Sequence, residues 1–179
     1  HYGAVHDPAS LQRIETLSVL FEKWIFDPAM GAVIEDFGLD WSRANEVRIE
    51  PGHCYEWAFL LDEVERLTGR DTASWQRRLI DFAERRGVYQ GFAVDILGAE
   101  PVSYRLWPQL ERLRALAPRE GSDIQAILDH IIENYLKPGP DHGWIDRLDR
   151  ALQPNVSAIP ASMVYHLVTS LAPLAPPGR

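Results

Sequence analysis

Cysteine, lysine and long apolar runs are all scarce in this sequence of 179 residues. A single cysteine, Cys54, excludes an intrachain disulfide, which indicates a reducing compartment, and we expect a cytoplasmic protein. No apolar stretch approaches the roughly 20 residues that a transmembrane helix needs. The segment His1–Ser10 lacks the basic and then apolar order of a secretion signal. We therefore expect a soluble chain that does not contact a membrane.

The basic residues are nearly all arginines, and they are scattered along the chain. Of the 18 basic residues only Lys23 and Lys137 are lysines, and the formal net charge is −8. Domains that bind nucleic acid gather their basic residues in a patch, so we expect no nucleic-acid partner. Hydrophobic residues make up 46% of the chain and charged residues 25%. This balance is typical of a globular protein, and the length favours one packed unit, residues 1–179.

Several motifs of cofactor-dependent enzymes are also missing. The sequence has no Gly-rich phosphate loop, no cluster of cysteines and no His-Glu-x-x-His pattern. We therefore expect no cofactor and no bound metal. His53, Glu56 and His166 leave a metal set open as an alternative.

Six segments have the apolar periodicity of amphipathic helices, with Asp, Ser, Thr or Pro at their starts and Gly or Pro at their ends. They are predicted at about 8–26, 51–68, 72–86, 106–117, 122–136 and 161–172. The very short connection between the second and third segments makes these two helices antiparallel neighbours.

Three longer segments separate alternate helices: Gly31–Glu50, Val88–Tyr104 and Gly139–Pro160. Short alternating runs within them, such as residues 32–37, favour small β-hairpins. The pattern predicts an all-α toroid or solenoid of helix hairpins. In such a fold the long loops gather at one face, so residues at their exits share a common site.

His53 and Glu56 lie at the first of these loop exits. A helix that starts near Pro51 places them three residues apart on one face. The carboxylate can then accept a hydrogen bond from one imidazole nitrogen and raise the basicity of the other, as a general base requires. The alternative is structural: His53 caps the helix, and Glu56 stabilises its positive end.

A second histidine, His166, lies in the first turns of the last helix, after a loop punctuated by proline. On its own it has a structural alternative, as a packed core histidine. His130 lies in the middle of the fifth helix, away from any loop exit. We interpret His130 as a structural or exposed residue.

Aromatic residues beside polar groups provide candidate sugar contacts. Trp107 and Arg105 open the fourth helix, and an indole beside a guanidinium suits a polyol. The alternative for Trp107 is simple packing at a helix entry. The loop Asp141–Asp146 adds Trp144 between Gly143 and Ile145, with carboxylates at both of its ends.

Four runs in this order resemble the C-terminal half of the N-acylglucosamine 2-epimerase superfamily. They are EPGHCYEWAFLL (50–61), YRLWPQLERLRA (104–115), GWIDRLD (143–149) and IPASMVYHL (159–167). The bacterial mannose isomerases, often named mannose-6-phosphate isomerases, are the most similar branch. The resemblance covers nearly the whole chain.

The resemblance implies an (α/α)6 barrel of about twelve helices, of which this chain supplies half. It implies that His53 and His166 exchange protons with an opened sugar, that Glu56 assists, and that no cofactor takes part. Trp107 would form a wall against the sugar ring. The other implied sugar contacts are Arg105, Trp57, Trp144 and Asp146.

The family pattern also contains parts that this sequence lacks. Members run to about twice this length, and their first half supplies a further His motif and an Arg that polarises the carbonyl. Because half a barrel leaves an apolar edge, we expect self-association or pairing with a missing N-terminal half. Since the chain does not begin with Met, we expect a processed, tagged or truncated product, half of a split protein, or a half that pairs with itself.

Two functions of different classes follow. The first is an isomerase, a sugar 2-epimerase or aldose–ketose isomerase, that acts on mannose-type or N-acylglucosamine sugars through an enediolate. The second is a non-catalytic half-barrel remnant or protein-binding module. The two histidines favour the enzyme, whereas the absence of the first-half residues favours the remnant.

Overall fold

The structure is a computed structural model that describes residues 7–44, 47–139, 143–156 and 158–174. The α-helices are α2 (Pro8–Leu20), α3 (Pro51–Thr68), α4 (Ala73–Arg86), α5 (Leu106–Leu116), α6 (Ile124–Ile131) and α7 (Met163–Leu171). Each of the six predicted helices is therefore confirmed. Among these residues, none of the helices has the length and apolarity that a bilayer crossing requires.

Two helices end differently from the prediction. The first changes at Phe21 into a π-helical turn, η1 (Phe21–Ile25), and the fifth changes at Ile132 into another, η2 (Ile132–Leu136). A short 3-10 turn, η3 (Ala172–Leu174), follows α7. Apolar periodicity does not distinguish these wider turns from an α-helix, because the apolar face continues through them.

Local signals set the boundaries of α3. Pro51 occupies its first turn, where the missing N–H costs nothing, and Gly69 ends it with a φ of 75°. Its buried residues Cys54, Tyr55, Ala58 and Leu61 recur at helical spacing. The packed face of α3 is thus encoded by its own sequence.

The short strands form three antiparallel pairs. β1 (Phe26–Asp27) pairs with β2 (Ala32–Val33), and β3 (Val88–Tyr89) pairs with β4 (Phe92–Ala93). Both are local hairpins. The β3–β4 hairpin lies within 88–104, as expected, whereas the β1–β2 hairpin begins before Gly31 and only β2 falls in the run predicted at residues 32–37. The third pair is not local, since β5 (Ser103–Arg105) pairs with β6 (Arg147–Asp149) from a different long segment. Within the described residues of 139–160 the expected local pairing is limited to one antiparallel bridge, between Leu148 and Pro154.

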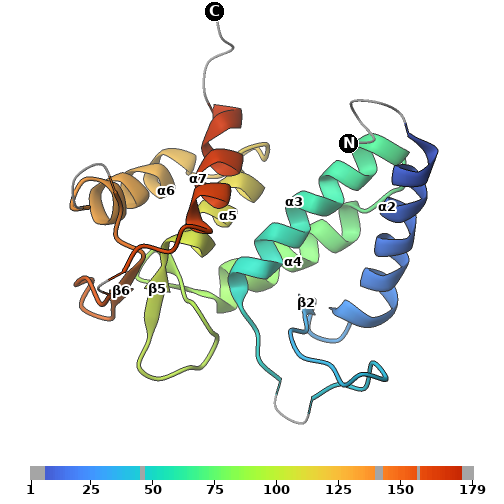
Figure 1. The fold of residues 1–179 in the computed structure, drawn as a ribbon, viewed down its shortest axis with the longest axis horizontal. Helices are drawn as coiled ribbons and strands as arrows, with labels where there is room; N and C mark the ends of the chain where they lie inside the picture. The colour runs from blue at the N-terminus through green and yellow to red at the C-terminus, as the bar shows by residue number, and fades with distance from the viewer. Residues whose placement is uncertain (1–6, 45–46, 140–142, 157, 175–179) are drawn as a thin grey trace, which may run out of the picture.

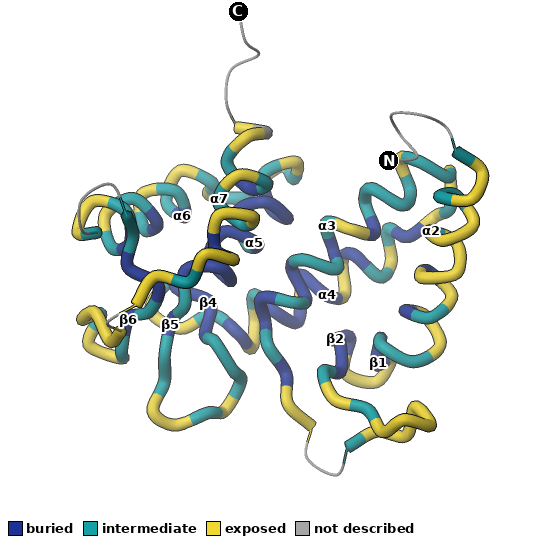
Figure 2. The backbone as a smooth tube through the Cα atoms, viewed as in Figure 1, coloured by how far each residue is buried: buried dark blue, intermediate teal, exposed yellow. Residues whose placement is uncertain are grey.

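The helices are arranged with α3, α5 and α7 as consecutive neighbours and with α4 behind α3 (Figure 1). Glu84 of α4 connects three helices: it accepts a hydrogen bond from Tyr55 of α3 at 2.6 Å and a bidentate pair from Arg112 of α5 at 2.7 and 2.8 Å. One buried apolar cluster extends from Phe21 to Met163. The most buried stretches of α3, α4 and α5 lie between the more exposed α2 and α7 (Figure 2).

Gly52 allows α3 and α5 to approach each other at the start of α3. A Cβ at this position would lie 2.4 to 3.0 Å from three ring carbons of Trp107, which is itself buried. The ring would have to move. The absence of a side chain at Gly52 therefore places the indole of Trp107.

We predict that Gly52→Ala lowers the free energy of unfolding by about 1–3 kcal/mol, as overpacking of a core does, and shifts the indole NMR signal of Trp107. Chemical denaturation and NMR measure the two effects. Gly69→Ala is the control: its φ of 75° makes it costly, but its Cβ would meet no atom within 4 Å. An unmoved Trp107 signal in Gly52→Ala would contradict this account.

Candidate functional site

A cavity of about 360 Å³ opens where the N-terminal ends of α3, α5 and α7 meet. Each helix follows a long connecting segment, as the sequence predicted for a shared site. The cavity is lined by Glu50, His53, Glu56, Arg105, Trp107, Ser162, Met163, Tyr165 and His166. The two candidate histidines are therefore brought together.

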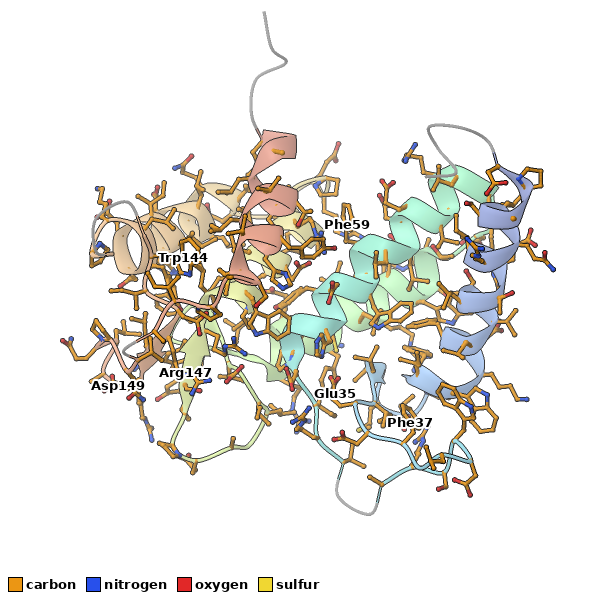
Figure 3. The ribbon with its side chains drawn as sticks, viewed as in Figure 1. Glu35, Phe37, Phe59, Trp144, Arg147 and Asp149 are labelled. Carbon is orange, nitrogen blue, oxygen red and sulfur yellow. The ribbon has the colours of Figure 1, made fainter. Side chains whose placement is uncertain are left out.

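His53 is oriented by a carboxylate from a distant segment. Its Nδ1 lies 2.8 Å from Oε2 of Glu35, in the loop after β2 (Figure 3). The other oxygen of Glu35 accepts the backbone N–H of Glu50 at 3.1 Å, which holds the loop against the start of α3. The predicted partner, Glu56, makes no hydrogen bond to His53 among the described residues. Glu35 takes that place because it reaches Nδ1 from outside the helix.

The surroundings of His53 favour its charged form. Burial disfavours an imidazolium, but the hydrogen bond and charge of Glu35, together with the charges of Glu50 and Glu56, outweigh it. The pKa of His53 is consequently raised above its ordinary value. An imidazole with a raised pKa is both a stronger base and a proton carrier at neutral pH.

His166 has an equivalent partner in Glu111 of α5. Its Nδ1 lies 2.7 Å from Oε1 of Glu111, a residue with no exposed surface. The second carboxylate oxygen of Glu111 accepts a hydrogen bond from Arg114, one turn further along α5. The buried ion pair of Glu111 with Arg114 thus holds the ring of His166 through its Nδ1.

Trp107 separates the two histidines. Its ring centroid lies 4.8 Å from that of His53 and 5.6 Å from that of His166. The indole is 6% exposed, and what is exposed lines the cavity. The arrangement is an aromatic wall with an imidazole on each side.

Glu56 lies in the same cavity with 23% of its side chain exposed. Burial raises the pKa of Glu56, and the charge of Glu111 adds to this effect, while His53, Arg114 and His166 oppose it. Its Oε1 lies 3.9 Å from Nη2 of Arg114. Glu56 is therefore a cavity carboxylate whose charge interacts electrostatically with His53, His166 and Arg114.

Arg105 and Asp146 form an ion pair at the edge of the cavity. The Nε of Arg105 lies 3.3 Å from Oδ2 of Asp146, and the β5–β6 pairing brings the two segments together. Asp146 is buried and lies behind Arg105 rather than on the cavity wall. Asp146 thus contacts Arg105 but does not line the cavity itself.

Two predicted sugar contacts lie elsewhere. Trp57 packs against Phe21, with ring centroids 4.6 Å apart, and does not line this cavity. Trp144 packs against the apolar core near α6 and also lies off the cavity wall (Figure 3). Asp141 and His142 of the same loop lie outside the described residues.

His130 packs as a structural residue. Its ring stacks on Phe92 with centroids 4.8 Å apart, and it lines a different cavity, of about 540 Å³, with residues of α4 and α6. In the described part of the chain no three His, Cys, Asp or Glu side chains are arranged to hold a metal ion. His53, Glu56 and His166, the alternative metal ligands considered from the sequence, are therefore not grouped as a metal site in the described residues.

Sequence reasoning missed Glu35 and Glu111, which bind the two histidines, and four residues of the cavity wall, Glu50, Ser162, Met163 and Tyr165. Glu35 carried no signal, because it is 18 residues from His53 along the chain. Glu111 did carry a signal, because it lies next to Leu110 among the apolar residues of α5. A carboxylate buried at such a position needs a hydrogen-bonding or charged partner.

Comparison with known proteins identifies the family to which this architecture belongs. A family model described as N-acylglucosamine 2-epimerase (GlcNAc 2-epimerase) matches residues 1–170. A curated protein named mannose-6-phosphate isomerase, from Rhizobium meliloti (strain 1021), is 28% identical over 166 residues, which cover 81% of this chain and 43% of that protein. The chain thus spans less than half the length of this relative.

Solved structures agree on the fold. Cellobiose 2-epimerase from Bacillus thermoamylovorans B4167 superposes with a TM-score of 0.72 at 20% identity, and a sugar epimerase from a ruminal bacterium with 0.77 at 13%. In both comparisons 86% of this chain covers 43% of the solved chain. The six helices are half of an (α/α)6 barrel, and since the family model covers nearly the whole sequence, the chain belongs to the N-acylglucosamine 2-epimerase family.

Proposed function

We propose that this chain is part of a cytoplasmic, cofactor-free sugar 2-epimerase or aldose–ketose isomerase. The observation that supports this most directly is the pair of carboxylate-bound histidines on either side of Trp107 in one cavity. Family membership supports the same chemistry. Two imidazole bases in one cavity suit an epimerisation, in which one base removes a proton from one face of a carbon and the other returns a proton to the opposite face.

The reaction would proceed through an enediolate. With Nδ1 of each histidine engaged by a carboxylate, Nε2 is left to exchange protons. One neutral imidazole takes the proton from C2 of the opened sugar, and the C–H electron pair forms a C1–C2 double bond as the carbonyl oxygen becomes an enediolate oxygen. Return of a proton to C2 from the other histidine inverts C2. Delivery of a proton to C1 instead, while the O2 hydroxyl proton passes to O1 and a carbonyl forms at C2, gives the ketose.

The remaining cavity groups have binding roles in this proposal. The indole of Trp107 offers an apolar face to the C–H groups of the sugar, and Arg105 offers fixed donors to its hydroxyls. Glu56 accepts hydrogen bonds from the hydroxyl groups of the sugar or of the enediolate. The names of the matched relatives favour a mannose-type or related sugar as the substrate.

We also propose that the chain folds as one unit and pairs with a second half, supplied by further residues of a longer protein or by a second copy. Neighbouring helices follow one another in the order α2, α3, α5 and α7. The first and last of these, α2 and α7, expose the apolar side chains Leu17, Val19, Val164, Tyr165 and Val168. The relatives are more than twice as long as the matched region. A partner that covers these faces would also complete the cavity.

We predict that the assembled protein incorporates solvent deuterium at C2 of a mannose-type sugar in heavy water, without added metal or nicotinamide. Either His53→Ala or His166→Ala should reduce turnover by about 10²–10⁴-fold, the usual contribution of a general acid or base. NMR of the product measures both the exchange and the rate.

His130→Ala is the matched control, because His130 packs on Phe92 outside the cavity. It should leave turnover within a few-fold of the unchanged protein. Full turnover in both cavity-histidine variants, or product without deuterium, would contradict the proposal. Absence of any turnover by the assembled protein would instead favour the non-catalytic half-barrel.

We predict that Glu35→Gln lowers the pKa of His53. The amide keeps the shape of the carboxylate but loses the charge, which removes the strongest stabilisation of the imidazolium and leaves burial unopposed by Glu35. An NMR pH titration of the His53 ring measures the shift. Glu63→Gln, a half-buried carboxylate of α3 that pairs with Arg66 outside the cavity, should leave the pKa of His53 unchanged. A His53 midpoint that stays or rises in Glu35→Gln would refute the role of Glu35.

A further inference from the structure

Arg105 places a guanidinium on the cavity wall, with 27% of its side chain exposed. Its Nε donates to Oδ2 of Asp146 at 3.3 Å, and Asp146 is buried behind the wall. The two Nη nitrogens of Arg105 make no hydrogen bond to the described residues. Neither is among the buried polar atoms that lack a partner, so both are accessible to solvent.

We propose that Asp146 is a positioning residue that fixes the guanidinium of Arg105 through Nε and so directs its two Nη groups at neighbouring hydroxyls of the sugar. This inference rests on the function proposed above, because it concerns how the same cavity holds its substrate. Asp146 touches no substrate itself. It acts through Arg105.

The first step is that the main chain of Arg105 is fixed from both sides. In the β5–β6 pairing Arg105 lies opposite Arg147, directly before α5 (Figure 1). The carbonyl of Arg105 accepts a hydrogen bond at 2.9 Å from the side chain of Gln109, which is buried. The next N–H, of Leu106, donates to the carbonyl of Asp146 at 2.8 Å. The backbone of Arg105 is therefore fixed relative to Asp146 and the cavity.

The second step concerns the guanidinium. A partly exposed arginine side chain samples many rotamers, and a hydrogen bond at Nε removes this freedom next to the guanidinium itself. Because Nε lies on one edge of the group, the end that carries the two Nη nitrogens stays open. Arginine uses such pairs of N–H groups to bind two oxygens at once. Hydroxyls on adjacent carbons of a sugar present a suitable pair of oxygens.

The burial of Asp146 favours this role over a stabilising one. Its second oxygen, Oδ1, is buried and has no hydrogen-bond partner among the described residues. A buried acceptor without a partner costs free energy, so a carboxylate that served stability would have both oxygens paired. Buried ion pairs are in any case a weak source of stability. The side chain of Asp146 is thus better placed to hold Arg105 than to stabilise the fold.

A second carboxylate acts on Arg105 through its charge alone. Asp95 interacts electrostatically with Arg105, but its Oδ2 lies 3.4 Å from Oγ of Ser103 and 3.7 Å from Nη2 of Arg147. Within the described part of the chain it makes no hydrogen bond to Arg105. Asp95 and Asp146 therefore separate the effect of a nearby charge from the effect of contact.

The test is the affinity of the assembled protein for mannitol, an unreactive hexitol, measured by NMR titration. Arg105→Met should weaken binding about 10-fold or more, the usual value of a hydrogen bond to a charged group. Asp146→Ala should weaken binding several-fold, because the guanidinium of Arg105 then loses its fixed direction. Asp146→Asn keeps an oxygen that can accept from Nε, so its affinity should lie between those of Asp146→Ala and the unchanged protein.

The double variant separates positioning from damage to the fold. If Asp146 acts through Arg105, then Asp146→Ala has no further effect on mannitol affinity in a chain that already carries Arg105→Met. Damage to the fold would add to the effect of Arg105→Met. Asp95→Asn is the matched control, since it removes a nearby charge without removing a hydrogen bond to Arg105, and it should leave the affinity unchanged.

A second readout needs no sugar. In ¹⁵N NMR the Nε–H signal of Arg105 should be protected from exchange with water in the unchanged protein and in Asp95→Asn. The protection should be lost in Asp146→Ala.

Three results would overturn the inference: free exchange of the Arg105 Nε–H in the unchanged protein, no binding of mannitol, or additive effects of Asp146→Ala and Arg105→Met. The first applies even where Asp146→Ala does not fold. A protein that turns sugar over but gives one of these results would keep the proposed reaction and lose this inference. Binding that depends on Asp146 through Arg105, without turnover, would do the reverse.

If both proposals hold, Asp146→Ala should raise KM several-fold and leave kcat nearly unchanged. Arg105 binds the substrate and its transition state alike, and neither residue carries the transferred proton.

Discussion

Each histidine of the cavity is bound at Nδ1 by a carboxylate from a distant part of the chain, and the geometry of the site depends on these two hydrogen bonds. They fix the ring planes of His53 and His166 through Nδ1 and do not involve Nε2 of either ring. They also connect the site to the fold, because Glu35 belongs to the loop after β2 and Glu111 to the core of α5. Moving either element would release a histidine.

The helices could be predicted because their signals are local. Pro51 and Gly69 mark the ends of α3, and apolar residues at helical spacing mark its packed face. The pairing of β5 with β6 could not be predicted, because it joins segments separated by two helices and brings Arg105 opposite Arg147. Short strands of this kind follow from the packing of the helices. The sequence of either strand alone does not specify its partner.

The site was partly predictable for the same reason. His53, His166 and Trp107 each stand at a helix start after a long segment, a position that sequence alone identifies. Their carboxylates are 18 and 55 residues away, where spacing carries no information. Trp57, one residue after Glu56, points to another face of α3 and packs on Phe21. Adjacency in sequence to a cavity residue is therefore a poor guide to the cavity wall.

The central claim is that the two histidines serve one bound sugar. The most direct measurement is a titration with a hexitol, an open-chain sugar alcohol, followed by ¹⁵N NMR of the histidine rings. The account predicts that the His53 and His166 signals move together with one dissociation constant, while His130 stays unchanged. Different constants for the two rings, or a response of His130 alone, would contradict it.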